Sequence, residues 1–356
     1  MSEVDFRALR ATNAWRAKCD LLEDIQLEIP AVDLVKTELE RVQTQIRTRY
    51  DSTQPWSPSN RAPVKGVIIF GRSGSTITRS LQTALGALKP VDLGDGHFID
   101  PKTTMMDAPD YGTTAAMSRD IINWVGGGKM VREPDNREAN RKVLSKMTNA
   151  QLTVFAIDRM HRLLNPDRHS VKGYRAETHM FWEQMIAIMS NPDWSTPLAL
   201  AGSEVMLTSL DMEDPIDKRR RVREEAFGKF SRVRLPDLTM SDDTFIIDTV
   251  QKYCITLGIH IVNDLFAADL ARRIVHASGY AYGHAIVLAR EACALAAVRP
   301  SSKGLKASDF ENTYAAWTSC GVDANPLNSP HWANIDTTRI APRTFEEAKH
   351  RPRDSA

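Results

Sequence analysis

The chain has 356 residues, of which 42% are hydrophobic and 26% are charged, as in ordinary globular proteins. Lysine and arginine total 46 and aspartate and glutamate total 45, so only local charge clusters could attract nucleic acid. The first residues show no secretion signal, no run of about 18 apolar residues occurs, and the four cysteines are widely spaced. These features argue against secretion and membrane spanning, and we expect a cytoplasmic protein with reduced thiols.

Residues 1–60 predict a helical extension that ends in a linker. Apolar residues recur three and four positions apart between Val32 and Ile46, which indicates an amphipathic helix. The Ser/Pro-rich stretch from Asp51 to Asn60 follows it. We favour packing of this helix against the rest of the protein over a role as a partner-binding arm.

Residues 61–240 alternate apolar strand patterns with helical patterns, which predicts an α/β domain with a parallel sheet. The first strand leads into the frame of a phosphate-binding loop, in which N–H groups cradle phosphates, a lysine reaches the outer phosphates and a hydroxyl binds Mg²⁺. Gly71 takes the first glycine position and Thr78 the hydroxyl position, but Thr76 replaces the second glycine and Ile77 replaces the lysine. Thr76 is a poor fit where the backbone must take a positive φ. The candidate nucleotide-binding residues of this loop are Gly71, Arg72, Ser73, Gly74, Ser75, Thr76, Ile77 and Thr78.

Two later apolar runs predict further strands of the same sheet. One run closes on Asp158, where a strand would present a carboxylate to Mg²⁺ together with Thr78. Arg159 follows it, at a position where an active ATPase carries a glutamate that polarises water. Another run, Pro197–Gly202, ends on Ser203, which is placed to sense a γ-phosphate.

A cluster of basic residues follows the third of these strands. It places five cations in six residues, a density that favours salt-sensitive DNA binding without sequence preference. Acidic residues flank the run on both sides, so a solvated helix start is the alternative. The candidate DNA-binding residues are Lys218, Arg219, Arg220, Arg221 and Arg223.

Residues 241–318 predict a small helical domain, and residues 319–356 a flexible tail that serves as a contact arm. The last helix of that domain is expected to start at Ser308, with Glu311 three positions on as its capping-box partner.

The order of these segments resembles the AAA+ ATPases of DNA transposition, the TniB, TnsC and Mu B group, and is most similar to TniB. The resemblance covers about residues 64–317. It rests on Gly71–Thr78, Ile157–Leu164, Pro197–Ser203, Lys229–Pro236 and Ser278–His284. It implies an AAA+ core with a C-terminal helical lid, nucleotide-dependent oligomers on DNA, and recruitment of a transposase.

The chain departs from this resemblance at four positions that serve hydrolysis. Ile77 replaces the loop lysine, and Arg159 replaces the glutamate. Lys229 replaces the arginine finger, and His284 replaces the second-sensor arginine. Phosphoryl transfer depends on such charges, and an arginine finger alone is worth about 10³–10⁵ in rate. We therefore expect hydrolysis to be lost, and ATP and Mg²⁺ to bind weakly or not at all.

The sequence thus predicts a DNA-binding assembly subunit of transposition with decayed ATPase chemistry. Its expected partners are double-stranded DNA, a transposase, and either further copies of itself or an active AAA+ paralogue. One alternative is a slow but active ATPase that regulates its own assembly on DNA, in which Arg72 or Arg79 supplies the missing cation. Another is a P-loop-fold module repurposed for defence or signalling.

Overall fold

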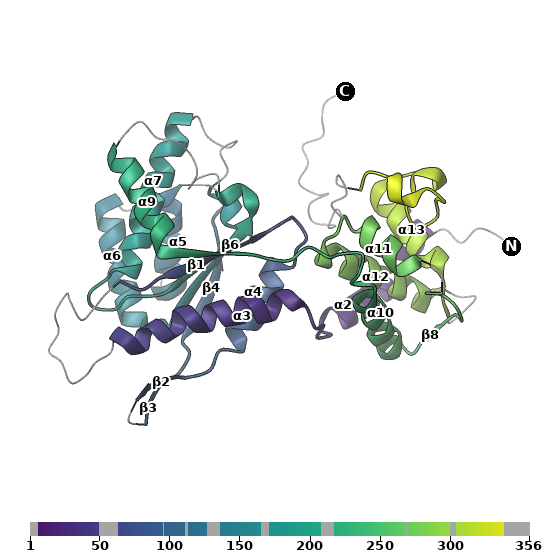
Figure 1. Ribbon diagram of the computed structural model, residues 1–356, viewed down its shortest axis with the longest axis horizontal. Helices are drawn as coiled ribbons and strands as arrows, with labels where there is room; N and C mark the ends of the chain where they lie inside the picture. The colour runs from purple at the N-terminus through teal and green to yellow at the C-terminus, as the bar shows by residue number, and fades with distance from the viewer. Residues whose placement is uncertain are drawn as a thin grey trace. The chain divides into compact units, whose positions relative to one another are not determined.

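The computed structural model describes residues 6–49, 63–94, 96–110, 113–126, 136–164, 171–207, 217–267, 269–299 and 304–337 (Figure 1). The chain divides into two compact units. The α/β unit comprises residues 29–72 and 77–236, and the helical unit comprises residues 1–28, 73–76 and 237–356. No helix of the described segments is long and apolar enough to cross a lipid bilayer.

A five-stranded parallel sheet forms the centre of the α/β unit, as the alternating sequence pattern predicts. Its strand order is β4-β5-β6-β1-β7. The strands are β1 (Gly66–Gly71), β4 (Thr103–Asp107), β5 (Val154–Asp158), β6 (Leu198–Ser203) and β7 (Phe230–Arg234). All residues of β5 are buried, because both faces of a parallel sheet are covered by helices. The register aligns Gly71 with Ser203 at the carboxyl ends of β1 and β6.

Helices cover both faces of this sheet (Figure 1). One face carries α5 (Thr114–Gly126), α6 (Asn136–Ala150), α7 (Val171–Met189) and α9 (Asp217–Lys229), and the other carries α3 (Pro30–Gln43) and α4 (Ile77–Gly86). Shorter elements are η1 (Thr44–Arg49), η2 (Met160–Arg162), η4 (Glu204–Leu207) and the hairpin of β2 (Val91–Gly94) and β3 (His97–Ile99). The largest side chains of this core include Phe155 of β5 and Phe181 and Trp182 of α7.

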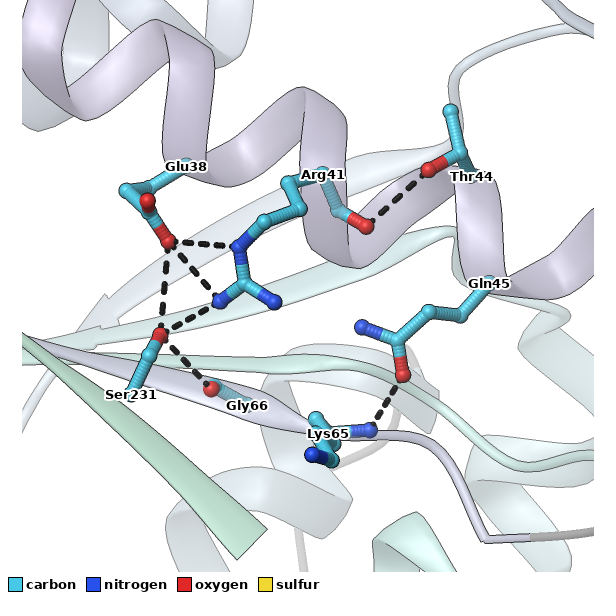
Figure 2. Close-up of polar contacts among 7 residues, drawn as sticks. All are labelled: Glu38, Arg41, Thr44, Gln45, Lys65, Gly66 and Ser231. Carbon is cyan, nitrogen blue, oxygen red and sulfur yellow. Dashed lines mark hydrogen bonds and ion pairs between the residues drawn. The ribbon is translucent and has the colours of Figure 1, made fainter.

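The amphipathic helix expected at residues 32–46 is α3, which begins at Pro30 because proline suits the first helical position. Its apolar stripe is fully buried at Val35, Leu39 and Val42, so it packs rather than projects as an arm. Figure 2 shows the polar contacts that join this region to the sheet. Arg41 donates from Nη2 to Ser231 Oγ at 2.6 Å, and Lys65 donates its backbone N–H to Gln45 Oε1 at 2.6 Å.

The helical unit is built around α12 (Tyr282–Val298), which is buried along most of its length. The other elements are α1 (Phe6–Arg10), α2 (Asn13–Glu23), α10 (Asp243–Leu257), β8 (His260–Ile261), α11 (Leu270–Ala277), β9 (Gly304–Leu305), α13 (Ala307–Thr318), η5 (Val322–Ala324) and η6 (Trp332–Asn334). The N-terminal helices α1 and α2 pack on α12, more than 250 residues further along the chain. The ion pairs Arg10–Glu291 at 2.5 Å and Arg290–Glu23 at 3.2 Å join them.

The start of α13 differs from the expected capping box. The helix begins at Ala307, and the carboxylate of Asp309 accepts from the Lys306 backbone N–H at 2.9 Å and from Arg299 Nη1 at 2.6 Å. Ser308 therefore lies inside the first turn rather than at the cap. Burial raises the pKa of Asp309, while the Lys306 N–H and the Arg299 guanidinium oppose that rise. The buried Asp309–Arg299 ion pair thus places the start of α13 at Ala307, whereas local sequence preference favours a start at Ser308.

Candidate nucleotide-binding site

The loop after β1 has the backbone that a phosphate-binding loop needs at two positions. Gly74 has φ +81° and Thr76 has φ +63°, both in the left-handed region. That conformation costs a residue with a side chain about 1–2 kcal/mol, so Thr76 is held there under strain. Helix α4 begins directly afterwards at Ile77, so Thr78 lies in its first turn, among N–H groups that have no partner within the helix.

The fold brings Thr78 and Asp158 together although 80 residues separate them. The Thr78 hydroxyl donates to Oδ2 of Asp158, and the Arg159 backbone N–H donates to Oδ1 at 2.7 Å. The carboxylate is 1% exposed. A hydroxyl and a carboxylate are hard oxygen ligands that suit Mg²⁺. This contact makes the pair the candidate Mg²⁺ ligands. The described residues hold no group of three or more His, Cys, Asp or Glu side chains that could bind a metal ion.

Arg159 is turned toward the neighbouring strand β4. Its Nη1 lies 3.0 Å from Oδ2 of Asp107, which is in register with Asp158 at the carboxyl ends of β4 and β5. Its backbone is left-handed, with φ +56°. A guanidinium cannot lose its proton in a protein, so Arg159 cannot accept one from water. Asp107 was not among the sequence candidates, although its strand also closes on an aspartate.

Ser203 ends strand β6, which lies between β1 and β5. Its backbone N–H donates to Nδ1 of His161 at 3.3 Å. This bond places an unprotonated nitrogen at Nδ1 and ties η2 to the end of β6. His161 therefore has a structural role, because this contact supports the end of the strand that carries Ser203.

Residues 73–76 of the loop group with the helical unit, where they contact the start of α12. The Gly283 N–H donates to the Gly74 carbonyl at 2.7 Å. A Cβ built on Gly74 would lie 2.4 Å from Nε2 of His284, so the imidazole packs directly against the Gly74 Cα. Nδ1 of His284 lies 3.1 Å from the Ser278 carbonyl, which fixes the ring. The second-sensor position is thus filled by a ring that contacts the loop itself.

Ser75 is the one loop side chain that is buried with its hydroxyl unsatisfied. It is 2% exposed, and its Oγ has no hydrogen-bond partner among the residues that the structure describes. Burying a hydroxyl without a hydrogen-bond partner costs free energy, which an acceptor would recover. A phosphate oxygen bound by the loop would be such an acceptor.

Lys229, at the arginine-finger position, is engaged within its own chain. Its Nζ contacts Ser190 Oγ at 2.9 Å and Glu225 Oε1 at 3.2 Å. The next residue, Phe230, pairs with Gly66 at the starts of β7 and β1. Lys229 therefore lies at the opposite end of the strands from Gly71.

The basic run lies on α9, and its members differ in exposure. Arg220 and Arg221 are exposed, whereas Arg223 is 6% exposed. Lys218 and Arg219 belong to the helix, but their side chains lie outside the described part of the chain. Only part of the run is therefore shown to face solvent.

The strand order, with the loop strand β1 between β6 and β7, and the C-terminal helices give the chain an AAA+ fold. The ORC1 protein of Aeropyrum pernix in complex with DNA is 12% identical, with a TM-score of 0.53 over 87% of this chain and 74% of that chain. The A. pernix ORC2 protein in ADPNP-ADP complexes is 12% identical, with a TM-score of 0.48 over 78% and 66%. Drosophila ORC bound to DNA is 10% identical, with a TM-score of 0.48 over 91% and 70%. No protein-family model and no curated sequence matches the chain. At this identity the similarity shows the fold, and no more specific family.

Proposed function

We propose that this protein is an AAA+ assembly subunit that binds double-stranded DNA and has lost ATP hydrolysis. The observation that carries the proposal is the Arg159–Asp107 ion pair beside an intact Thr78–Asp158 bond. The half of the site that holds a metal ion is kept, while the position that should activate water carries a permanent cation. This combination suits a subunit that assembles without turning over nucleotide.

The loop fits a nucleotide in part. Its N–H groups and the Ser75 hydroxyl would bind phosphate oxygens, and Thr78 and Asp158 would hold Mg²⁺. A bound Mg²⁺ would neutralise phosphate charge. Ile77 supplies no cation where the loop lysine would stand, so one positive charge is missing from the balance. Nucleotide binding is therefore weak in this proposal.

The finer proposal places the protein in DNA transposition, as a target-selection subunit that recruits a transposase. It rests on the order of motifs from Gly71 to His284, which resembles TniB. The DNA role draws support from the fold, which it shares with an archaeal protein solved in complex with DNA. Arg220 and Arg221 offer exposed charge for phosphates. The assembly consists of several copies of this chain, or of this chain together with an active AAA+ paralogue.

A slow, self-regulating ATPase is the second candidate. The Thr78–Asp158 bond and the unsatisfied Ser75 hydroxyl favour it, because a site with no remaining use would not need to keep either. Arg72 of the loop or Arg79 of α4 would supply the cation in that case.

Calorimetry with Mg²⁺ and ATP, together with a phosphate-release assay, separates the two candidates. We expect binding no tighter than about 1 μM, or about −8.2 kcal/mol, and turnover far below about 1 s⁻¹. Sub-micromolar affinity that requires Mg²⁺, with turnover that Thr78→Ala abolishes, would instead establish the slow ATPase.

A rescue experiment tests the stated cause of the loss. Ile77→Lys restores the loop cation and Arg159→Glu the acid, but the new glutamate would face Asp107. The set therefore includes Asp107→Asn, which removes that repulsion. We expect the triple variant to gain more ATPase activity than the single variants gain in total, because the parts of a phosphoryl-transfer site act as a unit. Equal activity of Ile77→Lys alone and the triple variant would remove Arg159 from the explanation.

A further inference from the structure

Helices α7 and α9 run side by side on one face of the sheet (Figure 1). Each connects two parallel strands, so both run against the strand direction and parallel to each other. Their buried stripes meet where the rings of Trp182 and Phe230 pack 5.7 Å apart, at the C-terminal end of α9. Seven residues earlier on the two segments stand Arg175 and Arg223. Seven residues span about two helical turns, or about 10.5 Å, and Phe230 directly follows Lys229, the last residue of α9. Both arginines therefore lie about two turns before the Trp182–Phe230 contact, on helices that run in the same direction.

Both arginines carry buried nitrogen atoms that lack an acceptor. Nε and Nη1 of Arg223, and Nε of Arg175, have no hydrogen-bond partner within the described segments. Arg223 is 6% exposed and shares its helix face with the buried Ala226. The same stripe of α7 is buried at Thr178 and Trp182. These are positions at which an apolar residue would normally stand.

An arginine in such a place needs an anion. Removing a guanidinium from water without a partner is strongly unfavourable, and buried charges in proteins are accordingly paired. Two guanidinium groups that approach each other on neighbouring helices also repel each other. A single anion between them would satisfy the unpaired N–H groups and remove that repulsion.

We propose that Arg175 and Arg223 form an oxyanion site that takes a phosphate group. The planar guanidinium binds oxyanions through paired N–H bonds. A phosphate carries a charge of about −1.5 to −2 near neutral pH, which matches two arginines, whereas one carboxylate matches only one. The site lies in the α/β unit and is independent of nucleotide binding at the loop. It also separates Arg223 from Arg220 and Arg221, whose side chains are exposed.

The test is thermal unfolding of the full chain in inorganic phosphate and in chloride of matched ionic strength. Phosphate should raise the Tm of the wild-type protein by roughly 2–3 °C at a tenfold excess over Kd. The shift should disappear in Arg223→Met and in Arg175→Met. It should persist in Arg221→Met, an exposed cation two residues from Arg223, and in Thr78→Ala, which alters the loop.

The chloride samples supply a second readout. Methionine fills the space of an arginine stem without its charge, so Arg223→Met should be at least as stable as wild type when phosphate is absent. A large loss of stability in chloride would show that Arg223 already has an anionic partner in the chain, and would overturn the proposal. An unchanged phosphate shift in Arg223→Met, or its loss in Thr78→Ala, would overturn it as well, the latter by assigning phosphate to the loop.

Discussion

At the scale of single residues, the candidate phosphate-binding loop has two left-handed positions, Gly74 and Thr76, and carries Ile77 where a lysine would stand. Gly74 meets a geometric demand, since its φ is +81° and the His284 ring fills the space where a Cβ would be. Thr76 meets a similar demand at a cost, with φ +63° and its hydroxyl bonded to the Ser75 carbonyl at 2.6 Å. Neighbouring contacts thus hold the loop backbone in this conformation, and a strained backbone persists only where such contacts fix it.

Substitution of Gly74 by alanine measures this constraint. We expect a loss of about 1–2 kcal/mol from the left-handed backbone and about 1–3 kcal/mol more from overpacking against His284. In a His284→Ala background only the backbone part should remain. Denaturant unfolding of the four proteins in this cycle gives the coupling free energy. A Gly74→Ala cost that is equal in both backgrounds would mean that the ring does not restrict this position.

At the scale of elements, α9 shows how helical periodicity divides a charge cluster. Arg223 and Ala226 are three positions apart and buried, whereas Arg220, Arg221 and Glu224 face solvent. Arg220 is partly offset by Glu224 at 3.7 Å, an exposed pair worth little. The basic run therefore has an exposed part, Arg220 and Arg221, and a buried part, Arg223.

The exposed half predicts a salt-dependent interaction with duplex DNA. Arg220→Ala with Arg221→Ala should weaken binding on every sequence and lower the slope of log K against log salt by about 2, near 0.9 for each lost phosphate contact. Lys142→Ala, an exposed cation on α6, is the matched control and should change neither quantity. Fluorescence anisotropy across a salt series measures both. An unchanged slope in the double variant would assign these arginines to a solvated face.

At the scale of the whole molecule, the two units take their residues from distant parts of the chain. Residues 1–28 join the helical unit through α2, where Leu22 is fully buried and Cys19 nearly so. Burial raises the pKa of the Cys19 thiol to about 12, so this cysteine acts as a core side chain. The chain then enters the α/β unit at Ile29, which is also buried.

Deletion of residues 1–28 should therefore destabilise the helical unit selectively. The loss of Leu22 alone compares with a large-to-small core substitution, worth about 2–5 kcal/mol. Hydrogen exchange should accelerate in α12 while protection of β1 and β5 is unchanged. Equal acceleration in both units would show that these residues support the whole chain, and no change in α12 would show that the N-terminal helices contribute little.

The sequence alone determined the parallel α/β core, the strand ends at Gly71, Asp158 and Ser203, and the helical character of the C-terminal part. These features follow from local periodicity and from the rule that parallel strands place their carboxyl ends at one edge. The similarity to a solved structure confirms the fold that these sequence features predict. The assignment to transposition stays a prediction.

Only the tertiary structure decided which residues meet. It paired Arg159 with Asp107, set His284 against Gly74, turned Arg223 into the core and chose Asp309 over Ser308 at the start of α13. Each of these outcomes depends on a partner from another element or on which helix face packs inward. The free energy of burying a charge or closing a contact depends on that partner, and no local pattern in the chain contains it.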